Sequence, residues 1–199
     1  MPHHKFKRPQ IQMLSRHFFI AVLLLALPAL TPARAESIPV AENLQQTAAE
    51  NGPDKVYLIM FGAEHCPYCF EMRDLYLEPM LTDPDYTDKL VIREVEIDQN
   101  SPMVDFDGNK TLQSVYARRF GVFLTPTLVF LDSKGREMAK KIVGLGDENY
   151  FTYYLDEAIG KALEKIRKQS ARSACGFVSA TGCRPTDRAP ARAWRGFAV

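Results

Sequence analysis

The sequence predicts an α/β fold in which a mixed four-stranded central sheet carries helices on both faces. Three observations predict it. A long crossover with a helical pattern joins the first two strand-like segments, which makes these two strands parallel. A turn from Asp132 to Gly135 joins the next two, which makes them antiparallel. A last helical pattern carries an apolar stripe that a sheet can cover. The expected strand order is second, first, third, fourth.

The first predicted helix and strand come early in the domain. Residues 40–51 alternate apolar and polar side chains at helical spacing and end before Gly52, a common helix stop. Residues 55–61 are apolar on both faces, as expected of a strand in the middle of a sheet.

The crossover is predicted to be a helix. Pro67 suits its first position, because proline lacks the N–H that would be unpaired there. The helix should run to about Met80, followed by a loop over residues 82–88. Residues 89–97, rich in Val and Ile, form the second strand. The buried side of the helix is expected to carry Cys69, Met72, Leu75 or Tyr76, and Pro79 or Met80.

The hairpin lies in the second half of the domain. Residues 98–110 are expected to form a loop, and Thr111 is a suitable cap for a helix that ends at Phe120. Residues 127–131 and residues 136–143 then form the third and fourth strands.

The last helix begins at Asp147 or Asn149 and completes a domain over residues 36–168. The composition then changes: residues 169–199 contain five arginines and one acid, and we expect this tail to be disordered. Docking of Trp194 on the domain is the alternative. The apolar stripe of the last helix is predicted to consist of Tyr150, Tyr154, Leu155, Ile159, Leu163 and Ile166.

The N-terminus, residues 1–35, has the organisation of a secretory signal peptide. Four basic residues precede an apolar stretch of about 13 residues that starts at Phe18, and a small-x-small site ends at Ala35. Roughly 20 apolar residues are needed to span a bilayer. We therefore expect cleavage after Ala35 and export to a bacterial periplasm, where disulfides persist. An uncleaved anchor is the alternative, and Met13 rather than Met1 is an alternative start.

The expected mature chain, residues 36–199, is long enough for one domain. It has 20 Lys and Arg against 24 Asp and Glu, a net charge of −4. Without a broad basic face, nucleic acid is not an expected partner. We expect the mature form to be soluble.

A dithiol motif, Cys66-Pro67-Tyr68-Cys69, follows the first strand. A spacing of three places both sulfurs on one face of a helix. Such a pair is typical of a redox centre, of half a metal site or of a structural bridge. A permanent bridge would add little stability, because it closes a very short loop.

Four segments resemble thioredoxin-fold proteins in their order and spacing, within about residues 40–166. The similarity is closest to exported bacterial thioredoxin-related proteins of the SoxW-like kind. It implies a thioredoxin-like fold and a thiol–disulfide oxidoreductase. The segments are Phe61 to Cys69, Glu96 to Asn100, Phe120 to Leu128, and Val143-Gly144.

The resemblance gives the site residues their roles. Cys66, at a helix N-terminus that favours a thiolate, is the nucleophile, and Cys69 is the resolving thiol. Pro126 resembles the family's cis-proline. Thr125 would then offer its backbone to an extended substrate peptide. Tyr68 is expected to line the substrate groove, with simple surface packing as the alternative.

Two positions depart from the family pattern. His65 replaces a tryptophan; it would support the thiolate electrostatically or touch substrate, and an exposed loop histidine is the alternative. Met60 replaces a buried acid. Glu94, on the next strand, is a candidate for the moved acid that relays the Cys69 proton; a surface acid is the alternative. A solvated helix face is expected from Glu71, Arg73 and Asp74.

Two further cysteines, Cys175 and Cys183, lie in the tail. In an oxidising compartment we expect them to pair with each other; exchange of this disulfide with Cys66 is the alternative. A zinc site built from all four cysteines is a rival, although their spacing is poor for one. We expect no metal ion and no cofactor.

The expected activity is reduction or exchange of disulfides in exported proteins, with a membrane thiol donor as a second partner. Thiol oxidation or isomerisation, and a non-enzymatic thioredoxin-fold binding module, remain alternatives.

Overall fold

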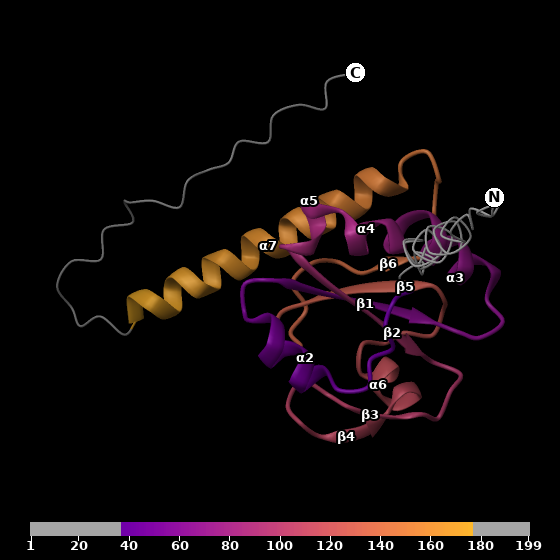
Figure 1. The fold of residues 1–199 in the computed structure, drawn as a ribbon, viewed down its shortest axis with the longest axis horizontal. Coiled ribbons are helices and arrows are strands. Elements are labelled where there is room, and N and C mark those ends of the chain that lie inside the picture. Colours follow the sequence, from indigo (N-terminus) through magenta and orange to yellow (C-terminus); the bar gives the residue numbers. More distant parts are fainter. Residues whose placement is uncertain (1–36, 177–199) are drawn as a thin grey trace, which may run out of the picture. The chain divides into compact units, whose positions relative to one another are not determined.

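In the computed structural model, which describes residues 37–176, the central sheet has the strand order β2-β1-β5-β6 that the sequence predicts (Figure 1). β1 is parallel to β2 and antiparallel to β5, and β5 is antiparallel to β6. All seven residues of β1 are buried, because a strand flanks it on each side and packed elements cover both faces of the sheet. The strands are β1 Val56–Gly62, β2 Leu90–Glu96, β5 Thr127–Leu131 and β6 Ile142–Val143.

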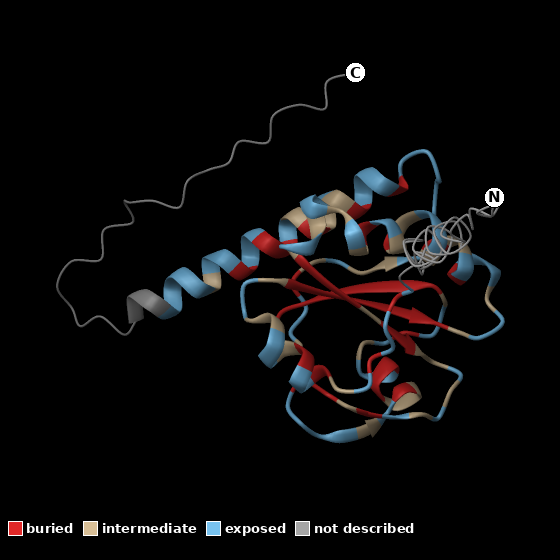
Figure 2. Ribbon diagram, viewed as in Figure 1, coloured by how far each residue is buried: buried red, intermediate tan, exposed pale blue. Residues whose placement is uncertain are grey.

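Helices cover both faces of this sheet (Figure 1). One face packs against α3, η1, α4, α5 and α7, and the other packs against α2, α6 and a small two-stranded sheet, β3-β4. Figure 2 shows that the central strands are buried while the outer sides of the helices are exposed. The bounds are α2 Leu44–Asn51, α3 Pro67–Glu71, η1 Met72–Leu77, α4 Glu78–Thr82, α5 Pro84–Thr87, β3 Pro102–Val104, β4 Lys110–Leu112, α6 Gln113–Arg119 and α7 Phe151–Gly176.

The two faces form two separate cores. Alternate side chains of β1 point to opposite sides, as strand geometry requires. Leu58 and Met60 join the core that contains Cys69, whereas Tyr57 and Phe61 join the other. The alternation therefore fixes which face of the sheet carries the dithiol.

Several predictions concern residues outside the described part of the chain. These are the signal peptide with its cleavage site at Ala35, the position of Cys183 and Trp194, and most of the tail. The side chain of Cys175 is also outside it. α7 continues to Gly176, past the point where we expected the tail to begin.

The predicted crossover helix is present, and it changes its winding midway. α3, η1 and α4 follow one another from Pro67 to Thr82, and η1 is a π-helical segment. The fully buried side chain after Met72 is Leu77, five residues on, and Tyr76 is partly buried against the same core. A π turn adds one residue to the usual spacing of three or four. Of the two alternatives predicted for this place, Tyr76 does pack on the core, whereas Leu75 is wrong because its side chain is 62% exposed.

The predicted loop at residues 98–110 contains additional structure. β3 and β4 form a short antiparallel ladder in which Thr111 is the partner of Met103. The prediction that Thr111 caps α6 is therefore wrong, because its backbone belongs to β4. Leu112 occupies the N-cap position, with no side-chain cap hydrogen bond.

The fourth strand is interrupted. Leu131 pairs with Glu137 and Leu128 with Ile142, so three steps along β5 face five steps on the partner segment. The extra residues form a bulge, which breaks the continuous strand predicted over residues 136–143.

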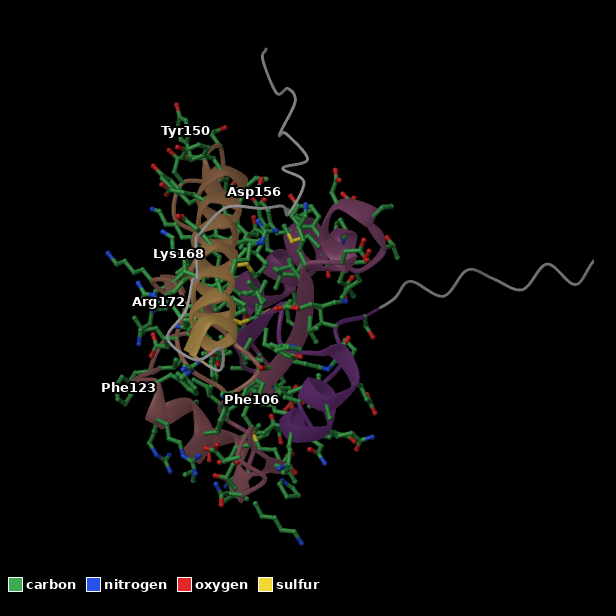
Figure 3. The ribbon with its side chains drawn as sticks, turned by 90° about the vertical axis from the view of Figure 1, so that its left-hand side faces the viewer. Phe106, Phe123, Tyr150, Asp156, Lys168 and Arg172 are labelled. Atoms are coloured by element: carbon green, nitrogen blue, oxygen red, sulfur yellow. A yellow bond between two sulfur atoms is a disulfide. The ribbon has the colours of Figure 1, made fainter. Side chains whose placement is uncertain are left out.

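The buried stripe of α7 agrees with prediction only in part. Leu155, Ile159, Leu163 and Ile166 are buried. Tyr150 precedes the helix, and both Tyr150 and Tyr154 are more than half exposed, so Phe151 begins the stripe instead. Figure 3 shows Tyr150 at one end of α7, with Arg172 towards the other.

Candidate redox site

Cys66 and Cys69 form a disulfide at the start of α3, with their Cα atoms 5.1 Å apart. Cys66 is the N-cap residue, and its Sγ accepts a hydrogen bond of 3.1 Å from the Cys69 amide. Pro67 occupies the first helical turn, as predicted. Cys66 is half-buried and Cys69 fully buried. The sulfur that an incoming molecule can reach is therefore that of Cys66.

The helix N-terminus favours a negative charge on this sulfur. Amide groups in the first turn of a helix have no partner within the helix, and the peptide dipoles add partial positive charge there. After reduction, both effects stabilise a Cys66 thiolate, the form that attacks disulfides.

The loop between β1 and α3 is tied to the end of β2. The Glu64 amide donates to Asp98 Oδ2 at 3.0 Å, and the Gln99 side-chain amide donates to Glu64 Oε2 at 3.0 Å. The Ile97 amide donates to the Gly62 carbonyl at 2.9 Å. The segment Glu96 to Asn100 was part of the family resemblance, but the sequence predicted no role for it. In the structure its residues hold the loop that carries Cys66.

The peptide bond between Thr125 and Pro126 is cis, as the resemblance implied. The register of β1 with β5 pairs Phe61 with Thr127, so Pro126 lies at the end of β1 that leads to Cys66. The Gly144 amide donates to the Pro126 carbonyl at 2.8 Å. Within residues 37–176, the Thr125 backbone takes part in no hydrogen bond.

Exposed apolar side chains flank both the dithiol and the cis-proline. Tyr68 and Phe70 lie beside the cysteines in sequence, and they are 63% and 49% exposed. Phe123 and Leu124 precede Thr125, and they are 75% and 67% exposed. Figure 3 shows Phe123 directed outward. His65 is also exposed, which both interpretations of this residue allow.

Glu94 is a buried acid, so the alternative of a surface acid is wrong. Its Oε1 lies 2.5 Å from Nη1 of Arg73, and the two side chains are 6% and 16% exposed. Burial raises the pKa of the Glu94 carboxyl, opposed by the hydrogen bond and charge of Arg73, while Glu96 and Glu78 raise it further. Arg73 is correspondingly not part of a solvated helix face.

Sequence reasoning therefore missed Arg73. The signal was its spacing of four from Cys69, which places it on the same side of a helix. Its guanidinium also lies over the Phe70 ring, 4.7 Å from the ring centroid. No contact joins Glu94 directly to Cys69 among the hydrogen bonds of the described residues.

Within the described part of the chain, no group of three or more His, Cys, Asp or Glu side chains is arranged to hold a metal ion. In the same residues, no helix has the length and apolar character needed to cross a membrane.

A family model described as a thioredoxin-like domain matches residues 41–159. Solved structures similar to this chain include the germline-specific thioredoxin Deadhead of Drosophila melanogaster, at 21% identity over 60% of this chain and 98% of that one, with a TM-score of 0.41. Fasciola hepatica thioredoxin is 19% identical over 63% of this chain and 99% of that one, with a TM-score of 0.42. A thioredoxin-fold protein from Helicobacter pylori is 22% identical over 60% of this chain and 87% of that one, with a TM-score of 0.40. A search of curated proteins finds no match.

Proposed function

We propose that this chain, which belongs to the thioredoxin-like domain family, is a thiol–disulfide oxidoreductase that reduces or exchanges disulfides through Cys66 and Cys69. One observation carries the proposal: the two cysteines form a disulfide at a helix N-terminus, with one sulfur half-buried and the other fully buried. That arrangement gives the two thiols different roles in one exchange cycle.

The reductive half of the cycle has two steps. The Cys66 thiolate attacks one sulfur of a substrate disulfide; a mixed disulfide forms, and the departing substrate thiolate takes a proton. The Cys69 thiol then loses its proton, and its thiolate attacks the sulfur of Cys66. The Cys66–Cys69 disulfide forms, the second substrate thiolate leaves and takes a proton, and the substrate has gained two electrons. An external dithiol donor returns the protein to its reduced form.

The Thr125 segment supports binding of an extended substrate. Its unpaired backbone groups can receive a peptide by strand addition, in which main-chain hydrogen bonds supply affinity. The exposed side chains of Tyr68, Phe123 and Leu124 add apolar contact around it. We therefore propose extended, apolar-flanked disulfides of exported proteins as substrates.

The proposed compartment is the bacterial periplasm, and its support is the signal-peptide organisation of residues 1–35. A periplasmic reductase needs electrons delivered across the membrane, so the proposed donor is a membrane thiol protein. Fusion of residues 1–35 to a reporter that is active only outside the cytoplasm should give an active reporter. An inactive fusion would contradict export.

The activity is tested by reduction of insulin in the presence of dithiothreitol. We expect the wild-type protein to accelerate it and Cys66→Ser to abolish the acceleration, because the attacking sulfur is lost. Cys69→Ser should instead accumulate a mixed disulfide with substrate, visible on a non-reducing gel. Equal rates for wild type and Cys66→Ser would overturn the proposal.

Equilibration with glutathione determines the direction of electron flow. A reduction potential near about −270 mV supports a reductase, whereas one near about −120 mV supports a thiol oxidase.

A further inference from the structure

We propose that a face of exposed tyrosines at the start of α7 binds the arginine-rich C-terminal segment of the same chain, residues 184–197. This tyrosine face consists of Tyr150, Tyr153 and Tyr154. The contact goes beyond the proposed oxidoreductase function and does not depend on it.

The tyrosine face lies on the side of α7 that points away from the core. The Tyr154 amide donates to the Tyr150 carbonyl at 3.1 Å, so these two residues are one helical turn apart, and Tyr153 is their neighbour on the same side. The three side chains are 58%, 65% and 52% exposed in chain order, and Figure 2 shows the outer side of this helix as exposed. The rings of Tyr153 and Tyr154 meet edge to face with their centroids 5.6 Å apart.

Phe151 and Leu155 fix the orientation of the tyrosine face. Both side chains are buried in the core that contains Cys69, and the Phe151 ring lies 4.5 Å from the ring of Tyr76 on η1. The tyrosines therefore cannot turn inward without removing these residues from the core. Exposed apolar side chains that stand singly are normal on a protein surface, whereas a gathered group indicates an interaction site.

The surroundings of the tyrosine face are acidic. Residues 147–161 contain four acids and one base, Lys161, a net charge of −3. Lys161 pairs with Glu157 at 2.8 Å, so the only base of this stretch already has an acid as its partner. An occupant that fits this surface carries positive charge together with planar groups. Arginine has both properties, because its guanidinium stacks on aromatic rings and attracts carboxylates.

The C-terminal segment has the complementary chemistry. Residues 184–197 contain four arginines and one acid, a net charge of +3. Arg192 and Arg195 flank Trp194, and Phe197 follows. The arginines can stack on the tyrosine rings, and the two aromatic residues add apolar area to the contact.

The segment is long enough to return to the tyrosine face. α7 ends at Gly176, and Tyr154 lies 22 positions earlier in the same helix, a distance of about 33 Å at about 1.5 Å per residue. Trp194 follows Gly176 by 18 positions, which span up to about 60 Å when the chain is extended. Tethering also raises the effective concentration of the segment, which favours binding within one chain over binding to a neighbouring molecule.

The experiment uses Trp194 as its probe. Trp194 is the only tryptophan of the chain, so its fluorescence reports on this segment alone. The measurement is the quenching of that fluorescence by acrylamide in the full chain, with a synthetic peptide of residues 184–199 as the free reference. We expect the full chain to protect Trp194, and Tyr154→Ala to lower the ratio of bound to free segment about threefold, the effect of losing one exposed cation–π contact.

Two further changes should act in the same direction. The double substitution Tyr150→Ala and Tyr154→Ala should remove most of the protection. The double substitution Arg192→Gln and Arg195→Gln should remove most of it as well, and so should added salt, which screens the attraction between the charges. The arginine substitutions lie beyond α7 and leave the core unchanged, so they decide the question if the tyrosine variant does not fold.

Phe123→Ala is the matched control, because it removes a similarly exposed aromatic side chain, 75% exposed, from the loop before Thr125. It should leave the protection unchanged. Loss of protection in this variant would assign the segment to the substrate-binding loop and overturn the inference. Quenching equal to that of the free peptide would overturn it too, as would protection that survives the tyrosine substitutions. Protection that falls on dilution would assign the contact to a neighbouring molecule and overturn binding within one chain.

Discussion

Gly62 is a glycine for reasons of space rather than of backbone conformation. It lies inside β1 and is not among the glycines with a positive φ angle. What excludes a side chain is the Glu94 carboxylate, 2.6 Å from the position of a Cβ. A glycine within a buried strand is otherwise unfavourable, because it loses more backbone entropy and packs no side chain. The carboxylate therefore accounts for the residue.

Gly62→Ala should destabilise the protein by about 1–3 kcal/mol, the usual range for overpacking a filled site. The measurement is the free energy of unfolding in urea. Gly160→Ala is the matched control: Gly160 lies within α7, and apart from its chain neighbours and the backbone of its own helix no atom of the described residues lies within 4 Å of its Cβ position. The same substitution there should stabilise by roughly 0.5–1 kcal/mol, because alanine favours the helix.

A second substitution isolates the cause. In a Glu94→Ala background the carboxylate is gone, so the additional effect of Gly62→Ala should become smaller. An unchanged effect in that background would show that Glu94 is not what excludes the side chain.

Individual site residues differ in how far the sequence predicts them. Cys66, Cys69 and Pro126 stand in short motifs whose local geometry is fixed by neighbours in sequence. The Arg73–Glu94 pair depends on a contact across 21 positions of the chain, between a helix and a strand. Spacing alone indicated that Arg73 shares a side with Cys69, but only the packed structure shows which atom it meets.

At the scale of elements, the π-helical segment η1 determines which side chains the helix over residues 67–82 buries. The inserted turn leaves Cys69 and Met72 in the core and brings Leu77 there in place of Leu75. The sequence predicted the helix and its start correctly, because Pro67 and the apolar spacing are local signals. It did not predict the change of phase, because a π turn has no local signature in this sequence.

Two leucines two residues apart test which side chains of η1 face the core. Leu77→Ala should cost about 2–5 kcal/mol of unfolding free energy, since a fully buried leucine leaves a cavity. Leu75→Ala should stay within about 0.5 kcal/mol, since its side chain is mostly exposed. Chemical denaturation of both variants makes the comparison. Similar losses in the two variants would contradict the observed phase.

The remaining misjudged elements share one cause. The β3-β4 ladder and the bulge before β6 both depend on pairing between segments, which periodicity within a single segment does not reveal. By contrast, β1, β2 and β5 were predicted within a residue or two, because each is a continuous apolar run. Their order followed from the crossover and the hairpin, which are constraints of chain connectivity.

For the whole molecule, two buried acids give opposite dependences of stability on pH. Asp105 is almost fully buried and accepts hydrogen bonds from Arg119 at 2.6 Å and from the Asn109 amide at 2.8 Å. Burial raises the pKa of Asp105, but these hydrogen bonds and the charge of Arg119 outweigh it and lower the pKa overall. The pKa of Glu94 is raised, because burial outweighs its single arginine partner.

The sign of each contribution follows from linkage. Asp105 adds stability above the ordinary aspartate pKa of about 3.9, and this stability is lost as the pH falls through its lowered value in the folded protein. We expect Asp105→Asn to cost most near neutral pH and least in acid, measured by urea denaturation across this range. A cost independent of pH would contradict the lowered pKa.

Glu94→Gln supplies the opposite case for comparison. The wild-type contribution of Glu94 is greatest below the ordinary glutamate pKa of about 4.3 and declines as the pH rises through its raised value in the folded protein. The variant should therefore lack this decline.

The pairing of the N-terminal segment with β2 closes one margin of the sheet. Residues 39–41 exchange backbone hydrogen bonds with Glu94, so an incoming chain finds that part of β2 already occupied. At the opposite margin, β6 is only two residues long. Sheet margins that are covered or short resist unwanted association between molecules. A second molecule therefore finds little free backbone at these two margins of the described sheet, which lowers the tendency of the chain to associate through strand pairing.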